Sequence, residues 1–383
     1  MIFYYLSIIF ILIFFFIYLF YLLKFNKHFK MENNIGYCHP QRVSIIICAR
    51  NEEMNIRRVL DALLVQDYDY SFLEIIIAND QSTDKTGEIL KEYCDKHSFI
   101  KSFTVINRDL VKSPKKNAVK QAINIALGEI ILLTDADCLP TKNWIKSHIS
   151  MYDKYPETDM VVGFTKTDTS NDGLRINNDH IKPLPLKLSL LKYKFEHIDF
   201  LILMFAAQGA IQAGHPFSCS GQNLSYKKES FLSVQGFDNI DKFISGDDLL
   251  LMQKFVKNKK TIKFASYAEA YTVTLPVNSW RELINQRARW ASNLKVMPKM
   301  NTNFFIYLLS CFICIGLLPF FAIYIYIIKI FIDDLYLRHA LNDWGLKYKF
   351  IDIFWWYIIS PFYILLVTLL GIFSVFKWKD RRA

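Results

Sequence analysis

Long apolar runs lie at both ends of the chain, and a region of shorter apolar runs separates them. Three runs carry no charged side chain: residues 2–23, 304–328 and 353–376. Each is long enough to cross the roughly 30 Å hydrocarbon core of a bilayer as a helix. Pro319 would divide the second run into pieces too short to cross, so one kinked or tilted span is expected there. The pattern predicts a transmembrane anchor and two later spans, at residues 1–24, 301–329 and 351–376.

The charges beside these runs predict an orientation. Lys24, Lys27 and Lys30 follow the first run, and Tyr21-Leu22-Leu23 does not suit signal cleavage, so an uncleaved anchor is favoured over a signal peptide. The positive-inside rule then places the following domain, and a basic tail at 377–383, in the cytoplasm. Residues 330–350 are expected to form a loop, and their positive charges leave a re-entrant or interfacial segment as the alternative.

Beyond a juxtamembrane linker at 25–42, residues 43–300 alternate short β-branched runs with helical patterns. Strands are expected at 43–48, 73–78, 105–106 and 130–133, and helices at 56–64, 84–96 and 118–126. Ser82 or Thr83 is the expected cap of the second helix. Alternation of this kind predicts an α/β domain, with a mostly parallel sheet flanked by helices on both faces.

Polar clusters follow three of the expected strands: Arg50-Asn51-Glu52-Glu53, Asn79-Asp80 and Asp135-Ala136-Asp137. In parallel α/β sheets, ligands bind beyond the carboxyl ends of the strands. The three clusters are therefore expected to lie at one binding edge of the sheet.

Composition and missing motifs exclude several classes of protein. The net charge is +10, but no block rich in Lys and Arg is present, so nucleic acid is not expected as a partner. The excess charge fits membrane flanks and a pocket for a diphosphate. No GxGxxG, GxxxxGK[ST], GxSxG or HExxH motif occurs, which argues against dehydrogenases, P-loop enzymes, serine hydrolases and zinc hydrolases. The scattered cysteines suit reduced thiols.

Two acidic positions after strands have a chemical and a structural interpretation. Asp135 and Asp137 are spaced to hold Mg²⁺ or Mn²⁺ on a diphosphate, and a solvated acidic turn is the alternative. Asp80 could accept a hydrogen bond from a base or ribose, and an Asx turn or helix cap is the alternative.

Two later clusters have the same ambiguity. Asp247 and Asp248 precede a helix, where they either supply a general base or complement the helix dipole. Arg287, Arg289 and Trp290 lie on an expected amphipathic helix before a span. The arginines could hold a diphosphate and Trp290 could stack on a sugar, and an interfacial membrane helix is compatible with both roles.

Taken together, these motifs resemble those of the membrane-bound family 2 glycosyltransferases with a GT-A fold. The resemblance runs from about Val43 to Trp290 and rests on six segments in order: 44–53, 79–84, 115–118, 134–137, 220–226 with 236–238, and 246–248 with 286–290. The segment 134–137 is similar to the DxD motif, and Gln286 to Trp290 fits QxxRW. Asn79 and Gln81 depart from the family's Asp and Gly, and Gly246 replaces its Glu.

The resemblance implies a role for each cluster. Donor and nucleotide binding falls to Arg50, Asn51, Glu52, Asp80, Lys116 and Asp135; metal binding to Asp137 and Asp135; catalysis to Asp247 or Asp248; and diphosphate and acceptor contacts to Gln286, Arg287, Arg289 and Trp290. The expected activity is an inverting, metal-dependent hexosyltransfer from a nucleotide sugar, with UDP as the expected nucleotide. The expected place is the inner (plasma) membrane, which the chain crosses several times with its catalytic domain in the cytoplasm.

The acceptor is the least determined part. Three spans are few for a polymer channel, so a lipid or lipid-linked saccharide is favoured over a growing polysaccharide. A processive synthase of the cellulose, chitin or hyaluronan type is the alternative. A catalytically silent membrane scaffold is the alternative from another class.

Overall fold

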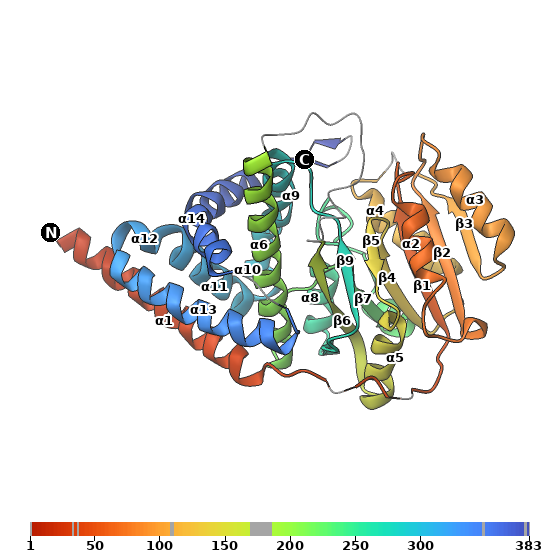
Figure 1. Ribbon diagram of the computed structural model, residues 1–383, viewed down its shortest axis with the longest axis horizontal. Helices are drawn as coiled ribbons and strands as arrows, with labels where there is room; N and C mark the ends of the chain where they lie inside the picture. Colours follow the sequence, from red (N-terminus) through yellow and green to blue (C-terminus); the bar gives the residue numbers. More distant parts are fainter. Residues whose placement is uncertain are drawn as a thin grey trace. The chain divides into compact units, whose positions relative to one another are not determined.

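The computed structural model describes residues 2–32, 34–36, 38–107, 111–168, 186–346, 349–378 and 381–382. The chain divides into two compact units (Figure 1). The first, here the α/β unit, comprises Lys30–Lys166 and Pro216–Leu275. The second, here the helical unit, comprises Met1–Phe29, Thr167–His215 and Pro276–Ala383.

The α/β unit is built on a mixed sheet with the strand order β3-β2-β1-β4-β7-β6-β9-β5, and β8 pairs with β6. Its strands are β1 Val43–Ala49, β2 Leu73–Asn79, β3 Ile100–Thr104, β4 Ile130–Asp135, β5 Cys138–Pro140, β6 Thr158–Thr167, β7 Leu224–Lys227, β8 Thr261–Ala265 and β9 Tyr271–Thr274. Strands β3, β2, β1 and β4 are parallel, whereas β7 runs antiparallel to both β4 and β6 (Figure 1). The sheet is therefore parallel in its first half and mixed in its second.

The strands expected from apolar runs are present at β1, β2 and β4. The third strand is β3, which ends at Thr104 and lies just before the expected 105–106. It is an edge strand with mostly exposed side chains, Lys101 and Ser102 among them. An edge strand has only one neighbouring strand and need not be apolar, which is why a search for apolar runs misses it.

Helices cover both faces of this sheet. They are α2 Ile56–Leu63, α3 Thr86–Lys96, α4 Pro114–Ile125, α5 Trp144–Lys154, α7 Lys228–Ser233 and α8 Leu249–Lys257. Ile45 and Ile47 of β1 pack in one core with the apolar face of α2, whereas Ala78 of β2 packs on the opposite face with Ala118 of α4. The two faces follow from the period of two in strand side chains.

Helix α3 begins at Thr86, two residues later than expected. Its N-cap position is Lys85, which provides no side-chain cap. The hydroxyl of Ser82, an expected cap, instead accepts a hydrogen bond from the Asn51 amide at 3.1 Å. Ser82 therefore bonds to the loop after β1 and does not cap its own helix.

The helical unit contains α1 Ile2–His28, α6 Leu186–Gln212, α9 Trp280–Ala291, α10 Met297–Met300, α11 Thr302–Phe312, a π-helical turn at Ile313–Leu317, α12 Leu318–Phe321, α13 Ile323–Asp343 and α14 Phe350–Ile372. Three stretches are long and apolar enough to cross a membrane: Leu6–His28, Thr302–Phe321 and Phe350–Ile372. They match the three expected spans, and α9 matches the expected amphipathic helix.

The region between the second and third spans differs from the expectation. The second stretch ends at Phe321, and α13 occupies most of the segment 330–350 that was expected to be a loop. The loop was expected because the segment lies between two apolar runs, and its positive charges left a re-entrant or interfacial segment as the alternative. The charges of α13 are paired within the helical unit. Lys329 is fully buried and forms an ion pair with Asp333, which also accepts a hydrogen bond from the Tyr18 hydroxyl at 2.8 Å. In the basic tail, Lys377–Trp378 pairs with Arg381–Arg382, and Lys379 lies outside the described residues.

Candidate active site

Two loops meet at the carboxyl ends of β1 and β2. The Arg50 guanidinium donates to the carbonyl oxygens of Asp80 and Gln81 at 2.7 and 3.2 Å. The Asn51 side-chain oxygen accepts from the Thr83 amide at 2.8 Å. Asn51 and Gln81 both have a positive φ, 54° and 56°, a conformation that few non-glycine residues adopt. Residues 50–53 and 80–86 therefore form one platform. The Arg50 side chain connects its two loops by bonding to the backbone of the second loop.

Glu52 and Asp80 lie on the same platform. The Glu52 amide donates to the Thr86 hydroxyl at 2.9 Å, and the Asp80 amide donates to the Ala49 carbonyl at 2.8 Å. Asp80 is only 6% exposed, so its carboxylate lies beneath the surface at the end of β2. The parallel register of the strands brings it near the next cluster.

The Asp135 carboxylate lies beside the end of β1, because Cys48 of β1 is paired with Asp135 of β4. Burial raises the pKa of the Cys48 thiol to about 12; Lys115 opposes this effect, and the nearby carboxylates of Asp135, Asp247 and Asp80 add to it. Charges from three separate segments thus surround one thiol. Asp80, Asp135 and Asp247, which lie far apart in the sequence, thus lie close enough within the α/β unit to act on the same group.

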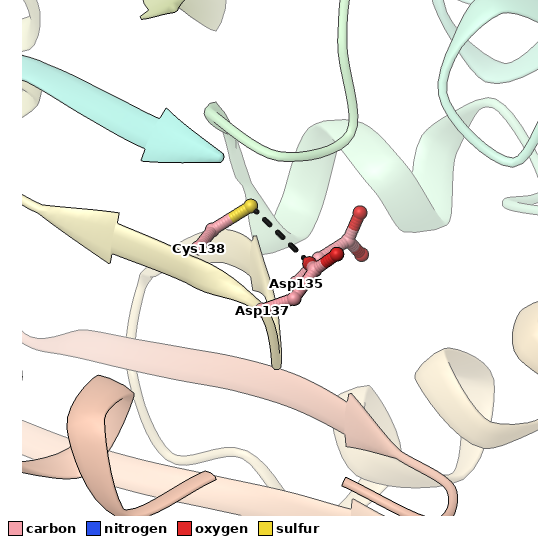
Figure 2. A group of neighbouring side chains, drawn as sticks. All are labelled: Asp135, Asp137 and Cys138. Carbon is pink, nitrogen blue, oxygen red and sulfur yellow. Dashed lines mark hydrogen bonds between the residues drawn. The ribbon is translucent and has the colours of Figure 1, made fainter. Parts of the chain in front are cut away.

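Asp135, Asp137 and Cys138 lie together in the turn between β4 and β5 (Figure 2). One potential ligand atom of each lies within 4.8 Å of the others. Burial raises the pKa of Asp137 to about 6, and repulsion from Asp135 and Glu52 adds to the shift. The thiol of Cys138 contacts the Asp137 carboxylate at 3.5 Å, and burial raises its pKa well above the usual value.

These properties fit a hard divalent cation. Burial and repulsion from Asp135 disfavour the charged form of Asp137, and a divalent cation between the two carboxylates would offset this repulsion. Oxygen ligands are also those that Mg²⁺ and Mn²⁺ prefer. Cys138 stays a neutral thiol and is a poor ligand beside them. The site would therefore hold the cation through Asp135 and Asp137.

Lys115 of α4 joins two of the acidic segments. Its ammonium lies 2.8 Å from a carboxylate oxygen of Asp135 and 2.8 Å from one of Asp247. Burial alone would lower the pKa of Lys115, but the two carboxylates outweigh it and hold the pKa well above its usual value. One cation thus bridges the candidate metal ligand and the candidate base. The sequence motif pointed to this stretch, but the lysine singled out there was Lys116.

Lys116 points to a different place. It is 1% exposed, and its ammonium donates to the carbonyl oxygens of Phe243 and Ser245 at 2.6 and 2.7 Å. Burial lowers its pKa to about 8. These bonds hold the loop that leads through Gly246, at φ +79°, to Asp247. Lys116 therefore positions the Asp247 loop, and direct contact with a donor remains only a prediction.

The two adjacent aspartates have different partners. Asp248 caps α8: one of its oxygens accepts from the Leu249 amide at 2.6 Å, and the other accepts from the Gly221 amide at 2.8 Å. Asp247 instead faces Lys115. Both aspartates line a small pocket together with Lys115, Asp135 and Gly221. Because both oxygens of Asp248 accept backbone amides, Asp247 is the better placed of the two to accept a proton.

Gln286, Arg287, Arg289 and Trp290 lie on α9, in the helical unit. Arg287 is buried, its Nη1 donates to the Gln286 side-chain oxygen at 2.5 Å, and its guanidinium carbon lies 4.1 Å from the centre of the Trp290 ring. Its Nε donates to Asp199 of α6 at 2.9 Å. Asp199 had no motif to mark it and was missed from the sequence.

Two family models match the chain. The model described as glycosyl transferase family 2 matches residues 44–230, and that described as glycosyl transferase family group 2 matches residues 193–375. The first covers the strand-end clusters and the DxD turn, and the second covers α9 and the last two apolar stretches. Together they span residues 44–375.

Several proteins of established or assigned activity are similar in sequence. A probable glycosyltransferase of Bacillus subtilis, YdaM, is 26% identical over 73% of this chain and 63% of its own length. A β-monoglucosyldiacylglycerol synthase of Nostoc is 35% identical over 25% of this chain and 20% of its own. A dolichyl N-acetyl-α-D-glucosaminyl phosphate glycosyltransferase of Methanococcus voltae is 34% identical over 29% of this chain and 34% of its own. The chain thus spans less than two thirds of each of these relatives.

A solved structure covers the whole architecture. The mannosyltransferase PcManGT from Pyrobaculum calidifontis, solved with GDP-Man and Mn²⁺, aligns over 96% of both chains with a TM-score of 0.59 and 16% sequence identity. This similarity establishes a GT-A-like fold, flanked by helices, over nearly the full length. The two family models, the sequence relatives and the fold all support a family 2 glycosyltransferase.

Proposed function

We propose that this glycosyltransferase moves a sugar, with inversion, from a nucleoside diphosphate donor to a lipid or a lipid-linked saccharide. UDP-sugars are the favoured donors. The observation that carries the proposal is the position of Lys115, 2.8 Å from both Asp135 and Asp247. It places a candidate donor-side carboxylate and a candidate base within reach of one ammonium, as a single displacement needs.

The nucleotide and the diphosphate occupy separate parts of the strand-end edge in this proposal. Asp80 and the platform that includes Asn51 and Glu52 bind the nucleoside. Arg50 stabilises the conformation of this platform through its bonds to the backbone. Asp135 and Asp137 would hold Mg²⁺ or Mn²⁺, and a cation there would neutralise charge on the leaving diphosphate. Lys115 adds a positive charge beside them.

Asp247 acts on the acceptor. Its carboxylate takes the proton of the acceptor hydroxyl, whose oxygen forms a bond to the anomeric carbon from the side opposite the diphosphate. The bond between that carbon and the diphosphate oxygen breaks, and the electron pair leaves with the nucleoside diphosphate. A single displacement of this kind inverts the anomeric centre. Lys115 holds the Asp247 carboxylate in place, and Asp248 anchors the same loop to α8.

The acceptor is proposed from the relatives and the apolar helices. The Nostoc relative is named for a glucosyldiacylglycerol product, and the Methanococcus relative for a dolichyl N-acetyl-α-D-glucosaminyl phosphate, which is a lipid-linked saccharide. Three stretches of this chain are apolar enough to cross a membrane, which would place the enzyme where such lipids occur. We place it in the inner (plasma) membrane with the α/β unit in the cytoplasm.

The test uses membranes that contain the full chain, a panel of radiolabelled nucleotide sugars and Mn²⁺. Label is expected in a small, lipid-extractable product, and EDTA is expected to abolish it. A long water-soluble polymer would instead identify a processive synthase. No product with any donor, and a cellular role unaffected by Asp247→Asn, would identify the silent scaffold. Asp95→Asn is the matched control, because Asp95 lies on the surface and pairs with Lys91.

A further inference from the structure

Helix α6 of the helical unit buries three charged residues on one face. Lys192, Glu196 and Asp199 are 1%, 3% and 7% exposed, and their spacing of four and three residues places them on one side of the helix. Burying charges is costly unless each has a partner with good geometry. Each of the three therefore needs an explanation.

Lys192 and Glu196 hold the residues that lead into α9. The Glu196 carboxylate accepts from the Val277 amide at 3.0 Å, and the Lys192 ammonium donates to the Val277 carbonyl. The two side chains also pair with each other at 2.9 Å. Val277 lies three residues before the first residue of α9, so these contacts fix where the helix starts.

Asp199 holds the middle of the same helix. It accepts from Arg287 Nε at 2.9 Å, and the two side chains are only 9% and 7% exposed. On its other side, the Arg287 guanidinium stacks on Trp290 at 4.1 Å and bonds to Gln286. A charge-assisted bond in a buried place is strong and directional. Asp199 thus holds Arg287, whose side chain contacts both ends of the Gln286–Trp290 segment.

Helix α14 supports α9 closely. A Cβ atom at Gly371 of α14 would lie 2.7 Å from the Ala288 carbonyl oxygen and 2.8 Å from the Ala291 Cβ. Backbones approach this closely only where a glycine leaves room. The position of α9 is therefore set by α6 and α14 of its own unit.

We propose that Asp199 is a positioning residue for the Gln286–Trp290 segment, acting through Arg287. Arg287 is held within the helical unit, which leaves Arg289 as the arginine of this motif to make the diphosphate contact that the motif implies. Two residues along an α-helix correspond to a rotation of roughly 200°, so Arg289 lies away from the side that Asp199 holds. This inference rests on the proposed function, because it assigns the diphosphate contact of that site to one of two arginines.

The first experiment measures whether Asp199 holds Arg287, and it needs no activity. The full-length protein in detergent is treated with phenylglyoxal, an arginine reagent, and each arginine is followed by mass spectrometry. Arg287 is expected to be protected while the exposed Arg281 of α9 reacts. Asp199→Asn is expected to raise the rate at which phenylglyoxal labels Arg287 about tenfold, since a tenfold change corresponds to the free energy of roughly one pKa unit. Equal reaction of Arg287 and Arg281 in the unaltered protein, or continued protection in Asp199→Asn, would overturn the proposal.

A matched control comes from the same helix. Lys194 of α6 pairs with Asp352 of α14 at 2.7 Å. Asp352→Asn therefore removes another ion pair made by α6, and the distance of that pair is similar to the distance between Asp199 and Arg287. It should leave Arg287 protected. Loss of protection in this variant too would show a general loosening of the helices and would count against Asp199 as the specific partner.

The second experiment measures the affinity for UDP in the presence of Mn²⁺ by calorimetry, with GDP as the alternative nucleotide. Asp199→Asn and Arg289→Ala should each weaken binding about tenfold, and the double variant should be no weaker than Arg289→Ala within twofold. Asp199→Glu should keep most of the affinity. The proposal would be contradicted if the double variant lost affinity by the product of the two single losses, or if Asp199→Asn lost no affinity. If neither nucleotide binds the unaltered protein, the proposed function is wrong, and the labelling of Arg287 still decides whether Asp199 holds it.

Discussion

The strand-end edge of the α/β unit and the interface between α6 and α9 in the helical unit both contain buried charges, but their balance differs. At the strand ends, the carboxylates of Asp135 and Asp247 share one ammonium, that of Lys115, and the carboxylate of Asp137 lies beside that of Asp135. Between α6 and α9, the carboxylates of Glu196 and Asp199 face the cations of Lys192 and Arg287.

This difference separates a binding site from a support. A surplus of carboxylates leaves the strand-end site short of positive charge, which a divalent cation would supply. Balanced pairs between α6 and α9 need no further partner and hold one helix against another. The same residue types thus serve chemistry in one unit and helix packing in the other.

The largest effect is expected from Asp247→Asn. The amide is the same size but cannot take a proton, so transfer should fall about 10³-fold, within the range of a lost general base. Asp248→Asn should lower the transfer rate less than Asp247→Asn does. It should also lower the melting temperature, because Asp248 caps α8. Initial rates with a radiolabelled donor and thermal melts measure both. Comparable transfer by Asp247→Asn and the Asp95→Asn control would remove the base assignment.

The next effect concerns pH and metal. The pKa of Asp137 is raised from 3.8 to about 6, so the folded protein without metal holds this proton more tightly than the unfolded chain. Its contribution to stability is therefore lost as pH rises through about 4 to 6. In EDTA, the melting temperature should fall by a few degrees over that range, and Asp137→Asn should remove this part of the fall.

Mn²⁺ should reverse the loss at pH 7 and act more weakly at pH 5, where protons compete for Asp137. Thermal melts at both pH values with and without Mn²⁺ provide the comparison. An identical pH profile for Asp137→Asn and the unaltered protein would mean that the surplus charge at the strand ends has been misjudged.

The two adjacent lysines should separate activity from stability. Lys115→Ala should lower transfer about 10- to 100-fold and change the melting temperature less than Lys116→Ala does, because the side chains of its partners Asp135 and Asp247 are 29% and 15% exposed and water can solvate them. Lys116→Ala should cost about 2–3 kcal/mol of folding free energy, since two carbonyls lose their buried donor. Rates and denaturant melts of the two variants measure the split. The opposite outcome would return Lys116 to the donor site.

The smallest effect is expected from Arg289→Ala at the α9 helix. Loss of one diphosphate contact should raise the KM for the donor about tenfold and leave kcat within about threefold. Steady-state kinetics over a range of donor concentrations measure it, with Arg281→Ala as the control from the exposed start of α9. An equal rise in the control would show a general effect of positive charge.

The sequence predicted well where the strand-end residues lie, and their roles stay predictions. Buried strands produce clear apolar runs, and the residues after them, such as Asp80 and Asp135, must lie at one edge of a parallel sheet. The choice between Lys115 and Lys116 could not be made, because adjacent residues of a helix differ by about 100° in direction and only the packing of α4 decides which one faces the site. Asp199 carried no signal at all, since its partner Arg287 lies 88 residues away.

The helix after the second span was missed by the search for apolar runs. The uncharged run ends before Lys329, yet Lys329 and Asp333 pair inside α13. A charged residue in an apolar helix looks unfavourable until its partner is known, and here the partner is one helical turn away. In contrast, the apolar stretches of α1 and α14 depend on no partner and were located correctly.

Titration of Mn²⁺ by electron paramagnetic resonance, with UDP present, tests the difference between the two regions most directly. The account predicts one tightly bound Mn²⁺ in the unaltered protein, its loss in Asp137→Asn, and its retention in Asp247→Asn and Asp199→Asn. Equal binding by Asp137→Asn, or no tight binding with UDP or GDP, would contradict the assignment of the strand-end carboxylates to a divalent cation.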